Sequence, residues 1–266
     1  MKKFTLLLIA LIAFSMNMVQ AQDKSLYEKH WFIQRGDTLP YRLLLPLNYD
    51  SSKKYPLVFF LHGRGESGRD NEKQLTHIAS FFLKDSIREQ YPAIILFPQC
   101  PWDDYWSNVD VTMVADGSAS GKRSFHFLAG GPPSTSMQLL SELVDDIFTR
   151  YPVKTRQVYI MGLSMGGMGT FELVRRKPGV FAAAVPICGG ADPSTASQLK
   201  NTSWWVFHGA KDDVVLPEHS EKMVTALKKN NVQVRFTLFQ DANHNSWDPA
   251  FNEPELMPWL FSKRKR

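Results

Sequence analysis

The fold of this chain is decided by the stretch Val158-Tyr159-Ile160-Met161-Gly162-Leu163-Ser164-Met165-Gly166-Gly167. Its first four residues are apolar without alternation, which is typical of a strand that is covered on both faces. The Gly-x-Ser-x-Gly motif that follows precedes a helical pattern containing Phe171 and Val174. This is the context of a nucleophile elbow, a tight turn that exposes a serine hydroxyl at the carboxyl edge of a sheet. We therefore predict that Ser164 is a nucleophile.

Similar apolar runs occur on both sides of this stretch and alternate with helical patterns. The apolar runs cover residues 57–61, 93–97, 182–187, 204–207 and 234–239, and the helical patterns cover residues 75–82, 137–147 and 223–227. This alternation predicts an α/β protein with a mostly parallel twisted sheet and helices on both faces. Two short extended runs near residues 27–34 and 41–45 predict an antiparallel hairpin at the N-terminal edge of that sheet.

The N-terminus has the plan of a secretory signal peptide. Lys2 and Lys3 precede the apolar run 6–14, and Val19-Gln20-Ala21 is typical of a cleavage site after Ala21. The apolar run is shorter than the roughly 20 residues that a membrane span needs. We therefore expect residues 1–21 to be removed and the mature protein to be secreted or periplasmic, without stable membrane insertion.

Residues 22–266 are expected to form a single domain. Its least regular part is a stretch at about 101–135, which has no clean period and contains several aromatic residues, glycines and prolines. Loops of this length in compact domains are usually functional or mobile. We expect this stretch to be an irregular insertion.

Charge and motifs exclude several functional classes. The formal net charge is +5, of which Lys2, Lys3 and the four basic residues 263–266 contribute +6, which leaves −1 for the remainder. We interpret the basic tail as a solvated end, so no nucleic-acid partner is expected. The histidines lack the H-E-x-x-H spacing of a zinc site, and no phosphate-binding loop is present, so we predict no metal and no cofactor.

A serine nucleophile needs a base, and the base needs an acid that orients it. His244 lies in a polar loop after the last apolar run and is the predicted base. The loop 208–215 offers two acids, of which we favour Asp212 because it lies where the loop turns back; Asp213 is the alternative. Asp241 and Glu66 are weaker candidates.

The oxyanion of an acyl-transfer intermediate needs backbone N–H donors. We predict that Met165, directly after the nucleophile, supplies one of them. The other is expected from the glycine-rich loop after the 57–61 run, with the N–H of Arg64 as first choice and that of Gly65 as second. Trp106 and Trp247 are predicted to line the substrate site.

Four motifs together resemble the α/β-hydrolase superfamily. They are His62-Gly63-Arg64-Gly65-Glu66-Ser67-Gly68, Gly162-Leu163-Ser164-Met165-Gly166-Gly167, His208-Gly209-x-x-Asp212 and the late His244. More narrowly, residues 27–262 are similar to secreted esterases and predicted peptidases related to prolyl oligopeptidase catalytic domains, dienelactone hydrolases and feruloyl or acetylxylan esterases. The resemblance implies the α/β-hydrolase fold and a Ser-His-Asp triad.

The resemblance and the signal peptide favour a secreted serine carboxylesterase of class EC 3.1.1. Its expected substrates are small-molecule or oligosaccharide esters, including feruloyl or acetyl groups on plant or microbial polysaccharide. One alternative is a serine peptidase or amidase of the prolyl-oligopeptidase type that uses the same residues. The other alternative is a non-catalytic binding module on a hydrolase fold, which the presence of all three triad residue types disfavours.

Overall fold

The computed structural model describes residues 24–115 and 122–265. The predicted signal peptide therefore lies outside the described residues. The strands are β1 (Glu28–Gln34), β2 (Asp37–Leu44), β3 (Tyr55–Leu61), β4 (Ile94–Pro98), β5 (Val109–Val114), β6 (Lys122–Phe127), β7 (Val153–Leu163), β8 (Ala183–Ile187), β9 (Ser203–Gly209) and β10 (Val234–Phe239). The α-helices are α2 (Ala79–Phe82), α3 (Asp85–Gln90), α4 (Thr135–Arg150), α5 (Met165–Arg176), α6 (Glu218–Lys229), α7 (Trp247–Phe251) and α8 (Leu256–Ser262). Short 3₁₀ helices cover η1 (Lys24–Leu26), η2 (Arg64–Glu66), η3 (Lys73–Leu75) and η4 (Pro193–Leu199).

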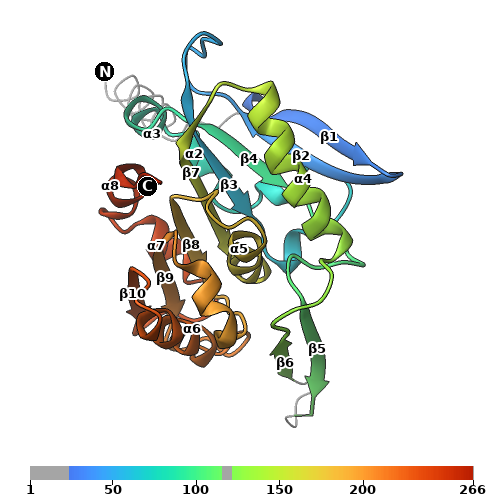
Figure 1. Ribbon diagram of the computed structural model, residues 1–266, viewed down its shortest axis with the longest axis vertical. Coiled ribbons are helices and arrows are strands. Elements are labelled where there is room, and N and C mark those ends of the chain that lie inside the picture. Colours follow the sequence, from blue (N-terminus) through green and yellow to red (C-terminus); the bar gives the residue numbers. More distant parts are fainter. Residues whose placement is uncertain (1–23, 116–121, 266) are drawn as a thin grey trace, which may run out of the picture.

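The main sheet has eight strands in the order β1-β2-β4-β3-β7-β8-β9-β10 (Figure 1). The pairs β1–β2 and β2–β4 are antiparallel. All pairs from β4 onward are parallel. The predicted α/β class, with a mostly parallel sheet and an N-terminal antiparallel hairpin, is confirmed.

Both faces of the sheet are covered by helices, which explains the apolar runs without alternation. In β3, Leu57, Phe59 and Leu61 belong to a core that includes side chains of α4, α5 and α6. Val58 and Phe60 belong to the opposite core, which includes side chains of α2, α7 and α8. Because successive side chains of a strand point to opposite faces, a strand buried on both faces must be apolar throughout. Within the described ranges, no helix is long and apolar enough to cross a membrane.

The helix predicted for residues 75–82 is wrong. Ile78 has a φ of +65°, in the left-handed region, which interrupts the helical backbone between η3 and α2. The carbonyls on either side of this break accept hydrogen bonds from distant side chains: Lys24 Nζ donates to the carbonyl of Leu75 at 2.7 Å, and the Tyr27 hydroxyl donates to that of Ala79 at 2.8 Å. These tertiary contacts occupy carbonyls that a continuous helix would use.

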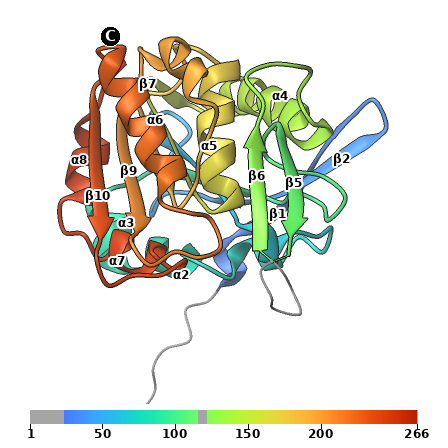
Figure 2. The ribbon, with the colours of Figure 1, turned by 90° about the horizontal axis from the view of Figure 1, so that it is seen from below.

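The stretch 101–135, expected to be an irregular insertion, contains an antiparallel hairpin of β5 and β6. This hairpin is separate from the main sheet and projects from the body of the molecule (Figures 1 and 2). Its base is fixed because Phe125 packs with Met168 and Val215. Val111, which pairs with Phe125, and Met113, nearer the tip, are 40% and 60% exposed. The hairpin is therefore anchored at one end and open to solvent along its length.

Candidate active site

Ser164 lies between β7 and α5 in a strained turn. Its φ of +53° and ψ of −117° are unusual for a residue with a side chain. The turn is held by the Ser164 N–H, which donates to the carbonyl of Ile187 at 2.9 Å. The flanking glycines allow the close approach, since a Cβ on Gly162 would lie 2.2 Å from the Gly166 carbonyl oxygen and one on Gly166 would lie 2.0 Å from that of Leu61. This geometry presents the Ser164 hydroxyl at the start of α5, as a nucleophile elbow does.

A hydrogen-bonded chain joins Ser164 to two later loops. His244, after β10, places its Nε2 3.0 Å from the Ser164 Oγ. Its Nδ1 lies 2.8 Å from Oδ2 of Asp212, which belongs to the loop after β9. Both loops leave the carboxyl ends of neighbouring parallel strands, so the topology brings them to the same edge of the sheet. The structure thus brings together the three residues that the sequence predicted, in the geometry that nucleophile, base and orienting acid require.

Asp212 is fully hydrogen-bonded, and its side chain is inaccessible to solvent. Oδ1 accepts from the N–H groups of Val214 at 2.9 Å and Val215 at 3.0 Å. Oδ2 accepts from His244 and also lies 3.1 Å from His208 Nε2. Burial alone would raise the pKa of Asp212, but the hydrogen bonds from His208 and His244 outweigh it and hold the pKa well below the usual range. The carboxylate is therefore ionised at neutral pH.

The alternative acids lie elsewhere. Asp213 is exposed, and no hydrogen bond joins it to His244. Asp241 is also exposed and pairs with Lys211 at 2.9 Å. Glu66 is largely buried and lies 3.4 Å from His77 Nε2. Of the four candidate acids, Asp212 is the one that contacts His244.

Two backbone N–H groups beside Ser164 have no acceptor within the described part of the chain. Met165 is the first residue of α5 and Arg64 is the first residue of η2. The first N–H groups of a helix lack intrahelical partners. The two elements are in contact, because a Cβ on Gly63 would lie 3.6 Å from the Ser164 Cβ. The loop that carries the Arg64 N–H therefore lies beside Ser164, and the oxyanion role of both N–H groups stays a prediction.

Comparison with known proteins identifies the family of this chain. The model of the Esterase family, described as "Putative esterase", matches residues 35–260. The chain belongs to the Esterase family. A solved structure described as a thermostable esterase is 31% identical, with a TM-score of 0.79 over 91% of this chain and 64% of the other. A ferulic acid esterase (17% identical, TM-score 0.62, 88% of this chain and 97% of that one) shares the fold.

This chain matches a smaller share of the length of two further relatives. Dipeptidyl peptidase 4 of Porphyromonas gingivalis shares the fold at 16% identity and a TM-score of 0.60, over 89% of this chain and 35% of that one. A bifunctional acetylxylan esterase/xylanase, XynS20E of Neocallimastix patriciarum, is 33% identical over 79 residues, which are 29% of this chain and 12% of that protein. This Esterase-family chain therefore spans only part of several proteins that it resembles.

The two tryptophans predicted to line the substrate site have different positions. Trp106 is fully buried, its ring contacts that of His62 at 5.5 Å between centroids, and it belongs to the core. The expectation that Trp106 contacts substrate is therefore wrong, because α5 and the loop after β3 cover it. Trp247 is half-buried, and its ring meets His244 edge to face at 5.6 Å. Trp247 borders the base, as expected of a residue at the substrate site.

Sequence reasoning missed two buried neighbours of Asp212. His208 contacts the carboxylate directly, and its signal was the His208-Gly209-x-x-Asp212 spacing at the end of an apolar strand. Cys188 follows β8 with a φ of +42°. Its Sγ lies within 4.8 Å of ligand atoms of Asp212 and His244, a donor set that could in principle hold a metal ion. However, burial raises the pKa of the Cys188 thiol strongly, and a metal would have to break the Asp212–His244 hydrogen bond.

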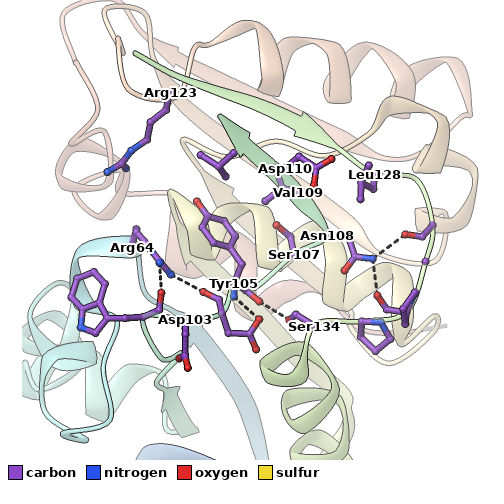
Figure 3. A pocket seen from close by; sticks show the side chains of 17 residues that line it. Arg64, Asp103, Tyr105, Ser107, Asn108, Val109, Asp110, Arg123, Leu128 and Ser134 are labelled. Carbon is purple, nitrogen blue, oxygen red and sulfur yellow. Dashed lines mark hydrogen bonds between the residues drawn. The ribbon is translucent and has the colours of Figure 1, made fainter. Parts of the chain in front are cut away.

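A hollow of about 730 Å³ adjoins the loop that carries the Arg64 N–H. It lies between the hairpin and the chain that leads into it, and we call it the hairpin hollow (Figure 3). Its lining includes Arg64, Trp102, Tyr105, Ser107, Asp110 and Arg123. The hollow is formed largely by residues of the stretch 101–135, for which the sequence predicted no regular structure.

Proposed function

We propose that this chain is a secreted serine carboxylesterase in which Ser164, His244 and Asp212 form the catalytic triad. The observation that carries the proposal is the continuous hydrogen-bonded chain from the Ser164 Oγ through both nitrogens of His244 to Asp212. Membership of the Esterase family supports ester hydrolysis. The N-terminal signal sequence supports secretion or export to the periplasm.

The proposed reaction has two halves. In the first, the Ser164 Oγ attacks the ester carbonyl carbon while its proton passes to His244 Nε2, and the N–H groups of Met165 and Arg64 donate to the oxyanion. His244 then returns the proton to the leaving alcohol as the C–O bond breaks, which leaves an acyl group on Ser164. In the second half, water loses a proton to His244 and attacks the acyl carbon, which releases the acid and restores the serine. Asp212 holds the imidazole and stabilises its charged form.

The proposed substrate class is an acyl ester on plant or microbial polysaccharide. It is supported by the local similarity to an acetylxylan esterase/xylanase and by the predicted secretion. Trp247, beside His244, is proposed to contact the acyl group. The position of Trp102, 50% exposed at the hairpin hollow, makes it a better candidate than Trp106 for contact with the alcohol side.

The test uses purified protein without residues 1–21 and matched esters and amides. We expect hydrolysis of p-nitrophenyl acetate and methyl ferulate, and labelling of Ser164 by a fluorophosphonate. The Ser164→Ala variant controls for contaminating esterases and should lose both signals, with a fall in kcat of at least about 10⁴-fold. Preferential cleavage of the amide would favour a peptidase, and absence of both labelling and turnover would exclude a serine hydrolase.

A further inference from the structure

The hairpin hollow contains polar donors that no described residue satisfies. Ser107 is 6% exposed, and its hydroxyl has no hydrogen-bond partner within the described ranges. The Tyr105 hydroxyl and the Arg123 guanidinium likewise form no hydrogen bond or ion pair with any residue that the structure describes. A buried polar group without a partner is costly, and this applies to Ser107. Tyr105 is half-buried and Arg123 is exposed, so their donors are open to a ligand that brings acceptors.

The two guanidinium groups of the hollow, those of Arg64 and Arg123, both lie near Tyr105. The Arg64 guanidinium lies 5.4 Å from the ring centre of Tyr105 and 5.5 Å from that of Trp102. Figure 3 shows Arg123 reaching from β6 toward the side of the hollow on which Arg64 lies. Burial raises the pKa of the Tyr105 hydroxyl, and the charges of Arg64 and Arg123 both oppose this rise. Both guanidinium groups therefore act on the same hydroxyl, which lies between them.

Three carboxylates line the hollow beside the two guanidinium groups, and the first two of them are already engaged by other groups. Asp103 pairs at 3.1 Å with Arg69, which does not line the hollow. Asp104 accepts from the N–H groups of Tyr105 at 2.7 Å and Ser136 at 2.6 Å. Asp110 remains, and its side chain points away from Arg123 in Figure 3. The side on which Arg123 and Tyr105 lie therefore offers donors without a described partner, whereas the lining as a whole holds more carboxylates than guanidinium groups.

We propose that the hairpin hollow binds a sugar ring that carries a carboxylate, such as a uronic acid residue of the polysaccharide that bears the ester. The carboxylate would accept from Arg123 and the Tyr105 hydroxyl, since guanidinium groups bind carboxylates in bidentate geometry. The exposed ring of Trp102 provides an apolar surface for one face of the sugar. The proposal rests on the proposed function for its position, because Arg64 both lines the hollow and supplies an oxyanion N–H.

Binding is measured on the Ser164→Ala protein, so that no turnover occurs. The probes are a xylo-oligosaccharide with a glucuronic acid branch and the same oligosaccharide without the branch, titrated by calorimetry. We expect the acidic probe to bind about tenfold more tightly, as charge-assisted hydrogen bonds to a carboxylate imply. In the Arg123→Gln variant this preference should disappear.

The matched control is Lys122→Gln. Lys122 is the neighbouring cation on β6, but its side chain lies on the other face of the hairpin and does not line the hollow. The control should keep the preference for the acidic probe. Equal affinity for both probes, or equal loss in the two variants, would overturn the proposal. This result is independent of catalysis, whereas turnover of p-nitrophenyl acetate by the unmodified protein tests the proposed function.

A second inference concerns the protonation of His208, whose side chain is inaccessible to solvent. The Ser220 hydroxyl donates its proton to the Gly189 carbonyl at 2.8 Å, so it accepts from His208 Nδ1 at 2.7 Å. Nε2 of His208 faces two further acceptors, the Val215 carbonyl at 2.8 Å and the Asp212 carboxylate at 3.1 Å. Each ring nitrogen therefore faces an acceptor and needs its own proton.

We infer that His208 is a buried imidazolium and acts as a positioning residue for Asp212. Its charge offsets that of the carboxylate, whose other partners are two backbone N–H groups and His244. The titratable groups around this pair are His244, Cys188 and His219. The positive charge of His208 behind Asp212 weakens the attraction between Asp212 and a proton on His244, and removal of that charge strengthens this attraction.

The test combines NMR with a pH profile. We expect two slowly exchanging ring N–H protons for His208 at neutral pH, identified by their loss in His208→Gln. In that variant a neutral amide replaces the charge, so the acid limb of kcat/KM for p-nitrophenyl acetate should move up by about one pH unit. A single ring N–H on His208 in the unmodified protein would overturn the inference whether or not the variant folds. A folded variant with an unchanged acid limb would overturn the positioning role.

Discussion

Two polar regions of the molecule, the surroundings of Asp212 and the hairpin hollow, differ in how their hydrogen-bonding groups are satisfied. Around Asp212 both carboxylate oxygens are occupied, by two N–H groups and two histidines. In the hairpin hollow the hydroxyls of Tyr105 and Ser107 and the guanidinium of Arg123 lack partners among the described residues. A satisfied network fixes geometry, whereas unpartnered donors gain most from a ligand. The first region is thus suited to hold the proposed catalytic groups, and the second to recognise what they act on.

The largest expected effect comes from Asp212→Asn, which disturbs the satisfied region. The amide preserves size but presents N–H groups toward His208 and His244, so His244 is held in the wrong tautomer. We expect kcat for p-nitrophenyl acetate to fall by about 10⁴-fold. Asp213→Asn is the matched control because its carboxylate is exposed, and it should retain the original rate. A fall of similar size in both variants would show that Asp212 is not the orienting acid.

The next largest effect is on the free energy of unfolding, and it should differ between two tryptophans of the stretch 101–135. Trp106 is fully buried, whereas Trp102 is 50% exposed at the hollow. Trp106→Ala leaves a large cavity and should lower the free energy of unfolding by about 3–5 kcal/mol. Trp102→Ala should change it by less than about 0.5 kcal/mol. Urea unfolding of both variants measures the difference, and equal losses would mean that the hollow is as tightly packed as the core.

Much of the satisfied region could be predicted from the sequence because its residues follow strand ends. Ser164, Asp212 and His244 each come directly after an apolar run, and parallel strands bring such positions to one edge. The sheet itself was predictable for the same reason, since burial on both faces removes alternation. The predicted strands near residues 57–61 and 234–239 agree closely with β3 and β10.

What could not be predicted depends on contacts between distant segments. The partners of His208 include Ser220 from α6, and no local pattern links the two residues. Trp106 was expected at the substrate site because aromatic residues in an irregular stretch look exposed, yet α5 and the loop after β3 bury it. The break at Ile78 likewise depends on side chains of the N-terminal segment. Local periodicity carries no information about such contacts.

The smallest expected effect concerns the pair of Glu66 and His77, which is less completely hydrogen-bonded than Asp212. Glu66 is largely buried in the loop that carries Arg64, and its one ion-pair partner among the described residues is His77, at 3.4 Å. His77 in turn contacts the ring of Trp247 at 5.1 Å. The hydrogen bond that His77 donates to the Glu66 carboxylate raises the pKa of His77. Burial and the charge of Lys24 oppose this rise, and the charges of Glu66 and Asp248 reinforce it.

Because the pKa of His77 is raised in the folded state, its stabilising contribution is complete below the ordinary histidine value of about 6.5 and is lost as the pH rises through the raised value. His77 is partly exposed, so we expect this loss to be less than about 1 kcal/mol between roughly pH 6 and pH 9. His77→Gln should abolish that part of the decline in unfolding free energy, measured in urea at both pH values. His126→Gln, an exposed histidine on the outer face of the hairpin, is the control and should keep the decline. If both variants decline alike, the Glu66–His77 contact contributes nothing, and only a fully satisfied network such as that around Asp212 stabilises this edge of the sheet.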